Sequence, residues 1–137
     1  KIIVDSAHNP HGIKALAKTL AEDGIRDLKL GFGALDTKDW LQMIDILAPF
    51  CKECVVAKPD SERGVSPAEI VNRLSCLGIK GSIANSAEEL VERVTSIPGE
   101  TALFTGSIYL IGKVRVALRS KGLGFKAEKI WTRNITS

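Results

Sequence analysis

Short apolar runs rich in β-branched residues alternate along this chain with segments in which apolar residues recur at helical spacing. This alternation predicts βαβ units, and therefore an α/β fold with an open, mainly parallel sheet and helices on both faces. Residues 1–122 are expected to form this single domain. Five strands are predicted, at Ile2–Asp5, Leu28–Phe32, Cys54–Ala57, Gly81–Ala84 and Thr101–Thr105.

Most of the predicted helices begin at a recognisable cap. Asn9 stands before Pro10 as an N-cap residue followed by proline at the first helical position, where each residue type is favoured. Ser66–Glu69 and Ser86–Glu89 each have the pattern of a capping box, in which serine and glutamate satisfy backbone N–H groups reciprocally. The last helix is predicted from about Ile108 to Ser120, with its buried face at Leu110, Ile111, Val114 and Leu118.

The second helix is predicted from about Thr37, with Asp36 or Thr37 as its cap and Pro49 just beyond its end. Its apolar face is expected to carry Leu41, Ile44 and Leu47.

The C-terminal segment 123–137 has no clean hydrophobic period. Its apolar residues are Phe125, Ile130, Trp131 and Ile135. The segment could be an added strand, a packed tail or a contact for a partner.

Composition narrows the class of protein. With 45% apolar and 26% charged residues, the chain is typical of a folded globular domain. The net charge of +3 is scattered and only 5% of residues are aromatic, so we expect no nucleic-acid partner. No apolar run approaches the roughly 20 residues that span a bilayer, so no membrane contact is expected. Three cysteines favour a reducing compartment, the cytoplasm or an organelle matrix.

The turn after the first predicted strand carries the most suggestive chemistry. Asp5, His8 and Asn9 follow one another within five residues, between a strand end and a helix start. In open parallel sheets ligands bind beyond the carboxyl ends of the strands, where helix N-termini favour anions. These residues could therefore hold a small ligand. Alternatively, Asp5 and Asn9 only cap backbone groups and His8 is a surface residue, whereas His11 is expected to be exposed.

A second turn, Thr105-Gly106-Ser107, follows the last strand and leads into a helix. Ser107 could help bind a phosphate or carboxylate, or serve only as an N-cap. Both turns are expected to contribute to one site. Gly31-Phe32-Gly33 begins like a dinucleotide-binding fingerprint but lacks the third glycine, and no GxxxxGK[ST] phosphate loop occurs. The pair Cys51 and Cys54 comes before a strand and does not open a helix, as a thioredoxin-type redox pair would. With Cys76 the chain has only three dispersed cysteines, whereas a zinc site requires four ligands.

Four segments in order resemble the C-terminal domain of folylpolyglutamate synthases and bifunctional dihydrofolate synthases, within the Mur ligase superfamily. They are Asp5-Ser6-Ala7-His8-Asn9-Pro10, Gly31 to Asp39, Glu62-Arg63-Gly64 and Thr105 to Gly112. The resemblance implies a Rossmann-like domain that closes over an ATPase domain. It implies a ligase that phosphorylates a carboxyl of a folate with ATP and couples the acyl phosphate to L-glutamate.

The resemblance also implies site residues. Asp5, His8 and Asn9 would contact ATP, with Asp5 on the ribose, while His8 and Ser107 would contact glutamate. The phosphate loop, the Mg²⁺ ligands and the folate pocket would lie in an upstream domain, so no metal ligand or catalytic residue is expected within this chain alone. The chain begins within a strand and without methionine, and we therefore expect a piece of a longer protein that is inactive by itself.

A competing interpretation is a free-standing, non-catalytic Rossmann-like module that binds a nucleotide or an amino acid through the same two turns. The upstream reading frame distinguishes the two, since a ligase requires roughly 250–300 further residues with a GxxxxGK[ST] loop. The choice between dihydrofolate and folylpolyglutamate synthesis depends on the folate pocket.

Overall fold

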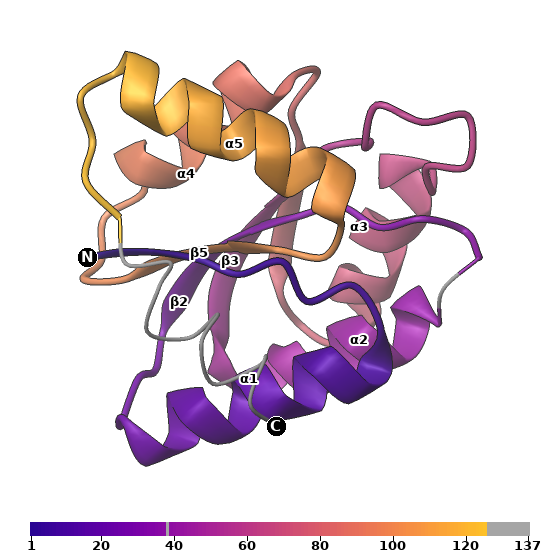
Figure 1. Cartoon of the computed structure of the whole chain (residues 1–137). Helices are drawn as coiled ribbons and strands as arrows, with labels where there is room; N and C mark the ends of the chain where they lie inside the picture. Colours follow the sequence, from indigo (N-terminus) through magenta and orange to yellow (C-terminus); the bar gives the residue numbers. More distant parts are fainter. Residues whose placement is uncertain (38, 126–137) are drawn as a thin grey trace.

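The computed structural model describes residues 1–37 and 39–125 (Figure 1). These residues form a five-stranded sheet of order β1-β5-β2-β3-β4 in which every pairing is parallel. The α/β class and the open parallel sheet expected from the sequence are confirmed. The strands are β1 Ile2–Val4, β2 Leu28–Phe32, β3 Cys51–Val56, β4 Lys80–Ile83 and β5 Ala102–Thr105.

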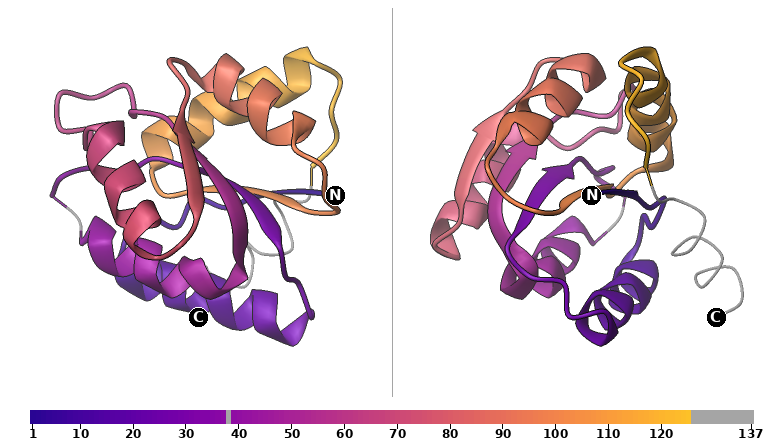
Figure 2. Two further views of the ribbon diagram at one scale, coloured as in Figure 1. Left: turned by 180° about the vertical axis from the view of Figure 1, so that it is seen from behind. Right: turned by 90° about the vertical axis from the view of Figure 1, so that its left-hand side faces the viewer.

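Helices cover both faces of the sheet (Figures 1 and 2). One face packs against α1, α2 and α3, and the other against α4 and α5. The bounds are α1 Pro10–Glu22, α2 Trp40–Leu47, α3 Pro67–Cys76, α4 Ala87–Ser96 and α5 Ile108–Ser120, with a 3-10 turn at Ala48–Phe50.

The pleat of the strands divides the apolar residues between two cores. Leu103 faces the core of α1 to α3, while its neighbour Phe104 faces the core of α4 and α5. Successive side chains of a strand point to opposite faces, so a strand covered on both sides must be apolar throughout. This explains why every residue of the central strand β5 is buried, whereas the edge strand β4 has exposed ends.

Strand ends differ from the predictions by a few residues. β3 begins at Cys51, three residues before the predicted start, because Leu28 at the start of β2 pairs with it. Likewise, β4 starts at Lys80, which pairs with Glu53. Neighbouring strands decide these ends through backbone pairing, which a local hydrophobic pattern does not report.

Helix α2 was predicted to start too early. It begins at Trp40, and the Oδ1 atom of its N-cap residue Asp39 accepts a hydrogen bond from the N–H of Gln42 at 3.4 Å. Asp36 was a wrong choice of cap, because its N–H donates at 2.7 Å to the carbonyl oxygen of Arg63. That bond holds the turn against the β3–α3 loop and delays the helix.

The buried face of α2 also differs from the prediction. Met43, Ile44 and Leu47 are buried, whereas Leu41 is 46% exposed. Each residue advances about 100° around the helix axis, so Leu41 lies more than a quarter turn from the centre of the buried face. Trp40 and Met43 belong to that buried face.

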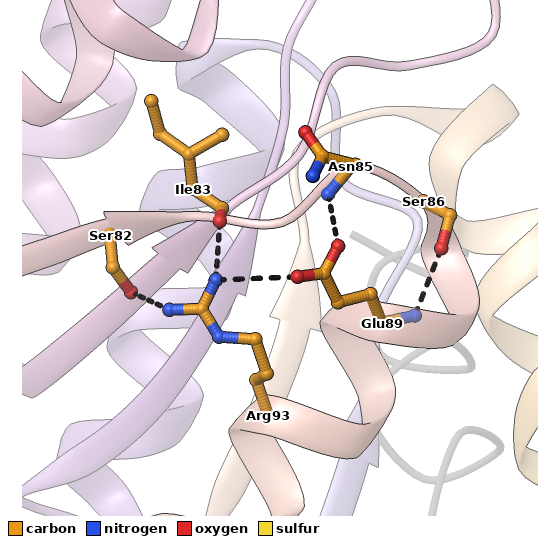
Figure 3. Close-up of polar contacts among 6 residues, drawn as sticks. All are labelled: Ser82, Ile83, Asn85, Ser86, Glu89 and Arg93. Atoms are coloured by element: carbon orange, nitrogen blue, oxygen red, sulfur yellow. Dashed lines mark hydrogen bonds and ion pairs between the residues drawn. The ribbon is translucent and has the colours of Figure 1, made fainter.

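Only one of the two predicted capping boxes uses its serine side chain. Ser66 is the N-cap residue of α3, but its side chain accepts no capping hydrogen bond. Ser86 Oγ accepts from the N–H of Glu89 at 3.0 Å, and the Glu89 carboxylate accepts from the N–H of Asn85 at 2.6 Å (Figure 3). The return bond thus reaches one residue before the cap.

Arg93 attaches the edge strand β4 to helix α4 (Figure 3). Its guanidinium donates to Ser82 Oγ at 2.5 Å and to the carbonyl oxygen of Ile83, and it lies 3.8 Å from the Glu89 carboxylate. A backbone carbonyl at a sheet edge is thereby given a partner.

The beginning of the predicted tail packs on the domain, since Leu123 and Phe125 contact the core of α4 and α5. The rest of the tail, 126–137, lies outside the described residues, and the domain boundary at 122 stays a prediction. Among the described residues, no helix is long and apolar enough to cross a membrane.

The difference in burial between Leu16 in α1 and Leu41 in α2 predicts different effects of their substitution on stability. Leu16 is 0% exposed, so Leu16→Ala should lower the free energy of unfolding by about 2–5 kcal/mol. Leu41→Ala, at the 46% exposed position, should change it by no more than about 0.5 kcal/mol. Urea denaturation of both variants measures the difference, and equal effects would contradict the assigned core.

Candidate functional site

Three strand-to-helix turns meet at the carboxyl edge of the sheet. They follow β1, β5 and β2, which are neighbours in the sheet although β1 and β5 lie far apart in sequence. A pocket of about 210 Å³ lies between the turns, lined by His8, Leu35, Gly106, Ser107, Ile108 and Tyr109. The two turns expected to form one site thus come together, with the β2 turn as a third wall.

Two glycines allow these turns to approach one another. Gly106 has a φ of +118°, and a Cβ atom there would overlap the carbonyl oxygen of Gly33 and the ring of Phe32. A Cβ atom on Gly33 would overlap the carbonyl oxygen of Ala57. Backbone therefore packs directly against backbone at both glycines. A side chain at Gly106 would push the β5 turn away from the β2 turn, and one at Gly33 would push the β2 turn away from the end of β3.

Asp5 lies beneath the β1–α1 turn and does not line the pocket. Its side chain is 0% exposed, and its Oδ1 atom accepts a hydrogen bond from the N–H of Ala7 at 2.8 Å. The carbonyl oxygen of Ala7 accepts from the N–H of Gly106 at 3.1 Å and from Thr105 Oγ1 at 3.3 Å. Asp5 therefore stabilises the turn from inside, and the β5 turn holds it from the other side.

His8 and Asn9 are the more accessible members of the predicted set, since both are only partly buried. The His8 ring lines the pocket, and its Nδ1 atom lies 3.2 Å from the carbonyl oxygen of Ser6. Asn9 caps α1, because its Oδ1 atom accepts from the N–H of Gly12 at 2.8 Å. His11 is exposed, as predicted.

Ser107 lines the pocket but is only 1% exposed. It is the N-cap residue of α5, and its Oγ atom accepts from the N–H of Leu110 at 3.5 Å. The N-termini of α1 and α5 both open at this edge of the sheet. Unpaired N–H groups and the helix dipole make such ends favourable for phosphate or carboxylate groups.

Sequence reasoning missed the apolar part of the pocket. Ile108 and Tyr109 are 56% and 58% exposed, and Leu35 faces them across the cavity. A usable signal existed in α5, where both residues fall outside the buried face that begins at Leu110. Large apolar side chains at an exposed helix start are typical of a contact surface.

Metal-binding groups are absent from the part of the chain that the structure describes: no three His, Cys, Asp or Glu residues there are arranged to hold an ion. Its three cysteines are free. Burial raises the pKa of the Cys51 thiol to about 12 and raises the pKa of Cys54 well above its usual value. These two thiols are therefore poor nucleophiles and poor metal ligands.

The fold and pocket define a doubly wound α/β domain whose ligand site lies at the carboxyl ends of the strands. Residues 1–108 match the sequence model of the family described as Mur ligase, glutamate ligase domain. The chain belongs to this family.

Two curated relatives are similar to the chain over most of its length. One is the probable bifunctional folylpolyglutamate synthase/dihydropteroate synthase of Haloferax volcanii, 30% identical over 117 residues, or 83% of this chain. The other is the folylpolyglutamate synthase of Lacticaseibacillus casei, 31% identical over 121 residues, or 85% of this chain. The chain spans only 14% and 27% of these two relatives.

Solved structures have the same fold. The bifunctional folylpolyglutamate synthase/dihydrofolate synthase of Yersinia pestis, complexed with AMPPNP and a Mn ion, superimposes with a TM-score of 0.75 at 22% identity. The match covers 86% of this chain and 28% of that one. Mycobacterium tuberculosis folylpolyglutamate synthase complexed with ADP gives 0.70 at 27% identity, covering 82% and 29%.

The close backbone approach at Gly106 predicts opposite effects for two glycine substitutions in neighbouring elements. Gly106→Ala should destabilise the chain by about 2–6 kcal/mol, the sum of backbone strain and overpacking. Gly112 lies inside α5 with open space around its Cα, so Gly112→Ala should stabilise by about 0.5–1 kcal/mol. Chemical denaturation measures both, and a neutral Gly106→Ala would contradict the close packing.

Burial also predicts which thiol reacts. Cys76 is exposed, whereas Cys54 is buried and Cys51 has the raised pKa described above. A chromogenic disulfide reagent at pH 8 should modify one thiol quickly, and the other two only after denaturation. Cys76→Ser is the control and should remove the fast phase. A fast phase that persists in this variant would contradict the assignment.

Proposed function

We propose that this chain is the glutamate ligase domain of an ATP-dependent folate ligase, which adds L-glutamate to a folate through an acyl phosphate. The observation that carries the proposal is the pocket at the N-terminus of α5, which is lined by His8 from the β1 turn and by Ser107. The named relatives support it, since they are folylpolyglutamate synthases. Because the chain spans 27% of the L. casei enzyme, the remaining machinery belongs to another domain.

The pocket supplies what such a reaction needs from a closing domain. ATP and glutamate are both anionic, and the N-termini of α1 and α5 favour negative charge. In this proposal His8 and Asn9 contact ATP, while His8 and Ser107 contact glutamate, whose carboxylate faces the first turn of α5. Asp5 supports the ATP contact from beneath the turn, since its carboxylate is buried. Closure would then orient the reacting groups and exclude water.

The divalent ion of the reaction belongs to the other domain in this proposal. The Y. pestis relative holds a Mn ion together with AMPPNP, and Mg²⁺ is the physiological ion we propose. The described residues of this chain do not fit such a site, because they contain no group of three suitable ligands. The chain's own contribution is therefore to bind and orient ATP and glutamate.

We further propose the cytoplasm or an organelle matrix as the location, which three free cysteines favour. No nucleic-acid partner is proposed, because the small net charge of +3 offers no basic patch.

The division of labour between domains is testable with the chain alone. Incubated with ATP, a reduced folate and radiolabelled L-glutamate, the 137-residue chain should form no labelled folate. The complete enzyme that contains it should form this product. Ligation by the chain alone would contradict the proposal.

His8→Ala in the complete enzyme should lower kcat/KM by about 10²-fold or more, the typical effect of removing a preorganised polar group from an active site. His11→Ala is the matched control, since His11 lies three residues away on the same turn and helix but is exposed, and it should leave kcat/KM within about 2-fold. Unchanged turnover in His8→Ala would instead favour a purely structural turn.

A further inference from the structure

Helix α5 packs with one side on the sheet, and its other side forms part of the outside of the domain (Figures 1 and 2). That outer side is apolar, since Ile108, Tyr109 and Val116 are 56%, 58% and 63% exposed. Each residue advances about 100° around the helix axis, so these three residues and Gly112 fall within a sector of about 100°. We call these four residues the α5 stripe. The other exposed large apolar side chains of the described residues belong to α2, the end of α3 and β4: Leu41, Leu77 and Ile83.

Gly112 lies in the middle of the α5 stripe, and no contact within the domain requires a glycine there. A Cβ atom at this position would stand in open space. Glycine is unfavourable inside a helix because of the backbone freedom that it loses on folding. A glycine at the centre of a helix contact lets a second helix approach closely, because the side chains at the contact set the distance between packed helices. The α5 stripe therefore has the composition of a helix-packing surface.

The charged residues of α5 are all positive, and the sequence has no Asp or Glu at positions 101–127. By the same helical geometry, Lys113 and Arg115 flank the α5 stripe on its two sides, and Arg119 follows it at the C-terminal end. Lys113 is paired with Asp60 at 2.9 Å, whereas the two arginines form no ion pair in the described part of the chain. There, the buried Nε atom of Arg115 also has no hydrogen-bond partner. A second copy of this face would bring like charges together, so an acidic partner fits it better.

The α5 stripe is continuous with the candidate ligand site. Ile108 and Tyr109 line the pocket, and Val116 lies two turns beyond them, about 12 Å along the helix from Ile108. The chain spans only 14% and 27% of its two curated relatives. A closing domain meets the rest of its enzyme around the ligands, so the rest of the enzyme is the partner nearest to this end of the stripe.

We propose that the α5 stripe is a docking surface for the rest of the enzyme, which contributes a helix with an apolar face and acidic flanks that crosses α5 at Gly112. The partner is the other domain of the ligase, so the proposal rests on the proposed function. Gly112 and Val116 are not among the residues that line the pocket. This part of the contact would hold the two domains together without touching either substrate, and the acidic flanks would bring carboxylates to Arg115 and Arg119.

Thiol labelling compares the α5 stripe in the isolated chain and in the complete enzyme. In a Cys76→Ser background, which removes the exposed thiol, Val116→Cys should react quickly with a maleimide in the isolated chain. In the complete enzyme it should react at least about 10-fold more slowly, either with or without AMPPNP, because docking covers the thiol. Mass spectrometry of the labelled peptide identifies the site.

Leu41→Cys, at the 46% exposed position of α2, is the matched control and should react equally fast in the isolated chain and the complete enzyme. Equal rates for Val116→Cys in the two proteins, both with and without nucleotide, would overturn the proposal. Protection that appears in the isolated chain and grows with its concentration would also overturn it, since it would indicate a second copy as the partner.

Substitution at Gly112 tests the point of closest approach. Gly112→Leu should leave the isolated chain folded by circular dichroism, because the position stands in open space, but it should restore fast labelling of Val116→Cys in the complete enzyme. Lys14→Leu, at an exposed position of α1, is the matched control and should leave the protection intact. Loss of protection in both variants, or in neither, would contradict docking at Gly112. An enzyme without ligase activity would refute the proposed function, whereas protection of the Val116→Cys thiol would still establish the contact.

Discussion

The contact between the β2 and β5 turns at Gly33 and Gly106 is the constraint on which the rest of this site depends. Because Gly106 has no side chain, its backbone lies against the carbonyl oxygen of Gly33, and its N–H donates to the carbonyl oxygen of Ala7 at 3.1 Å. The β1 turn is thereby attached to the β5 turn, so that His8 and the start of α5 line the same pocket. A wider spacing would leave buried backbone groups without partners, which is costly.

The polar side chains of the candidate site form hydrogen bonds with the backbone of the chain itself. Asp5, Asn9 and Ser107 all accept hydrogen bonds from main-chain N–H groups of their own turn or helix. These are the capping roles that compete with ligand binding as an explanation of each residue. In this structure the two roles are compatible, because the capped β1 turn presents the ring of His8 to the pocket and the capped β5 turn presents the first residues of α5. The capping hydrogen bonds that stabilise these turns therefore also shape the candidate ligand site.

Prediction from sequence worked best where the signal is local. The N-cap at Asn9, the helix Ile108–Ser120 and strand β2 were placed correctly. It failed where distant backbone intervenes, as when Arg63 bonds to Asp36 and delays α2, or when β2 extends β3 back to Cys51. The candidate site shows the same division. Its turns were identified, but the burial of Asp5 and the apolar wall of Leu35, Ile108 and Tyr109 were not.

By itself the sequence determined the βα units, most of their caps and the turns that carry polar chemistry, because hydrophobic period and capping depend on residues within a few positions of one another. Only the tertiary structure decided that β5 lies between β1 and β2, since strand order depends on contacts between segments far apart in the chain. That order brings Thr105 to Ala7, 98 residues away. It joins two separate capped turns into one pocket and places Asp5 beneath the β1 turn, where its carboxylate accepts a hydrogen bond from the N–H of Ala7.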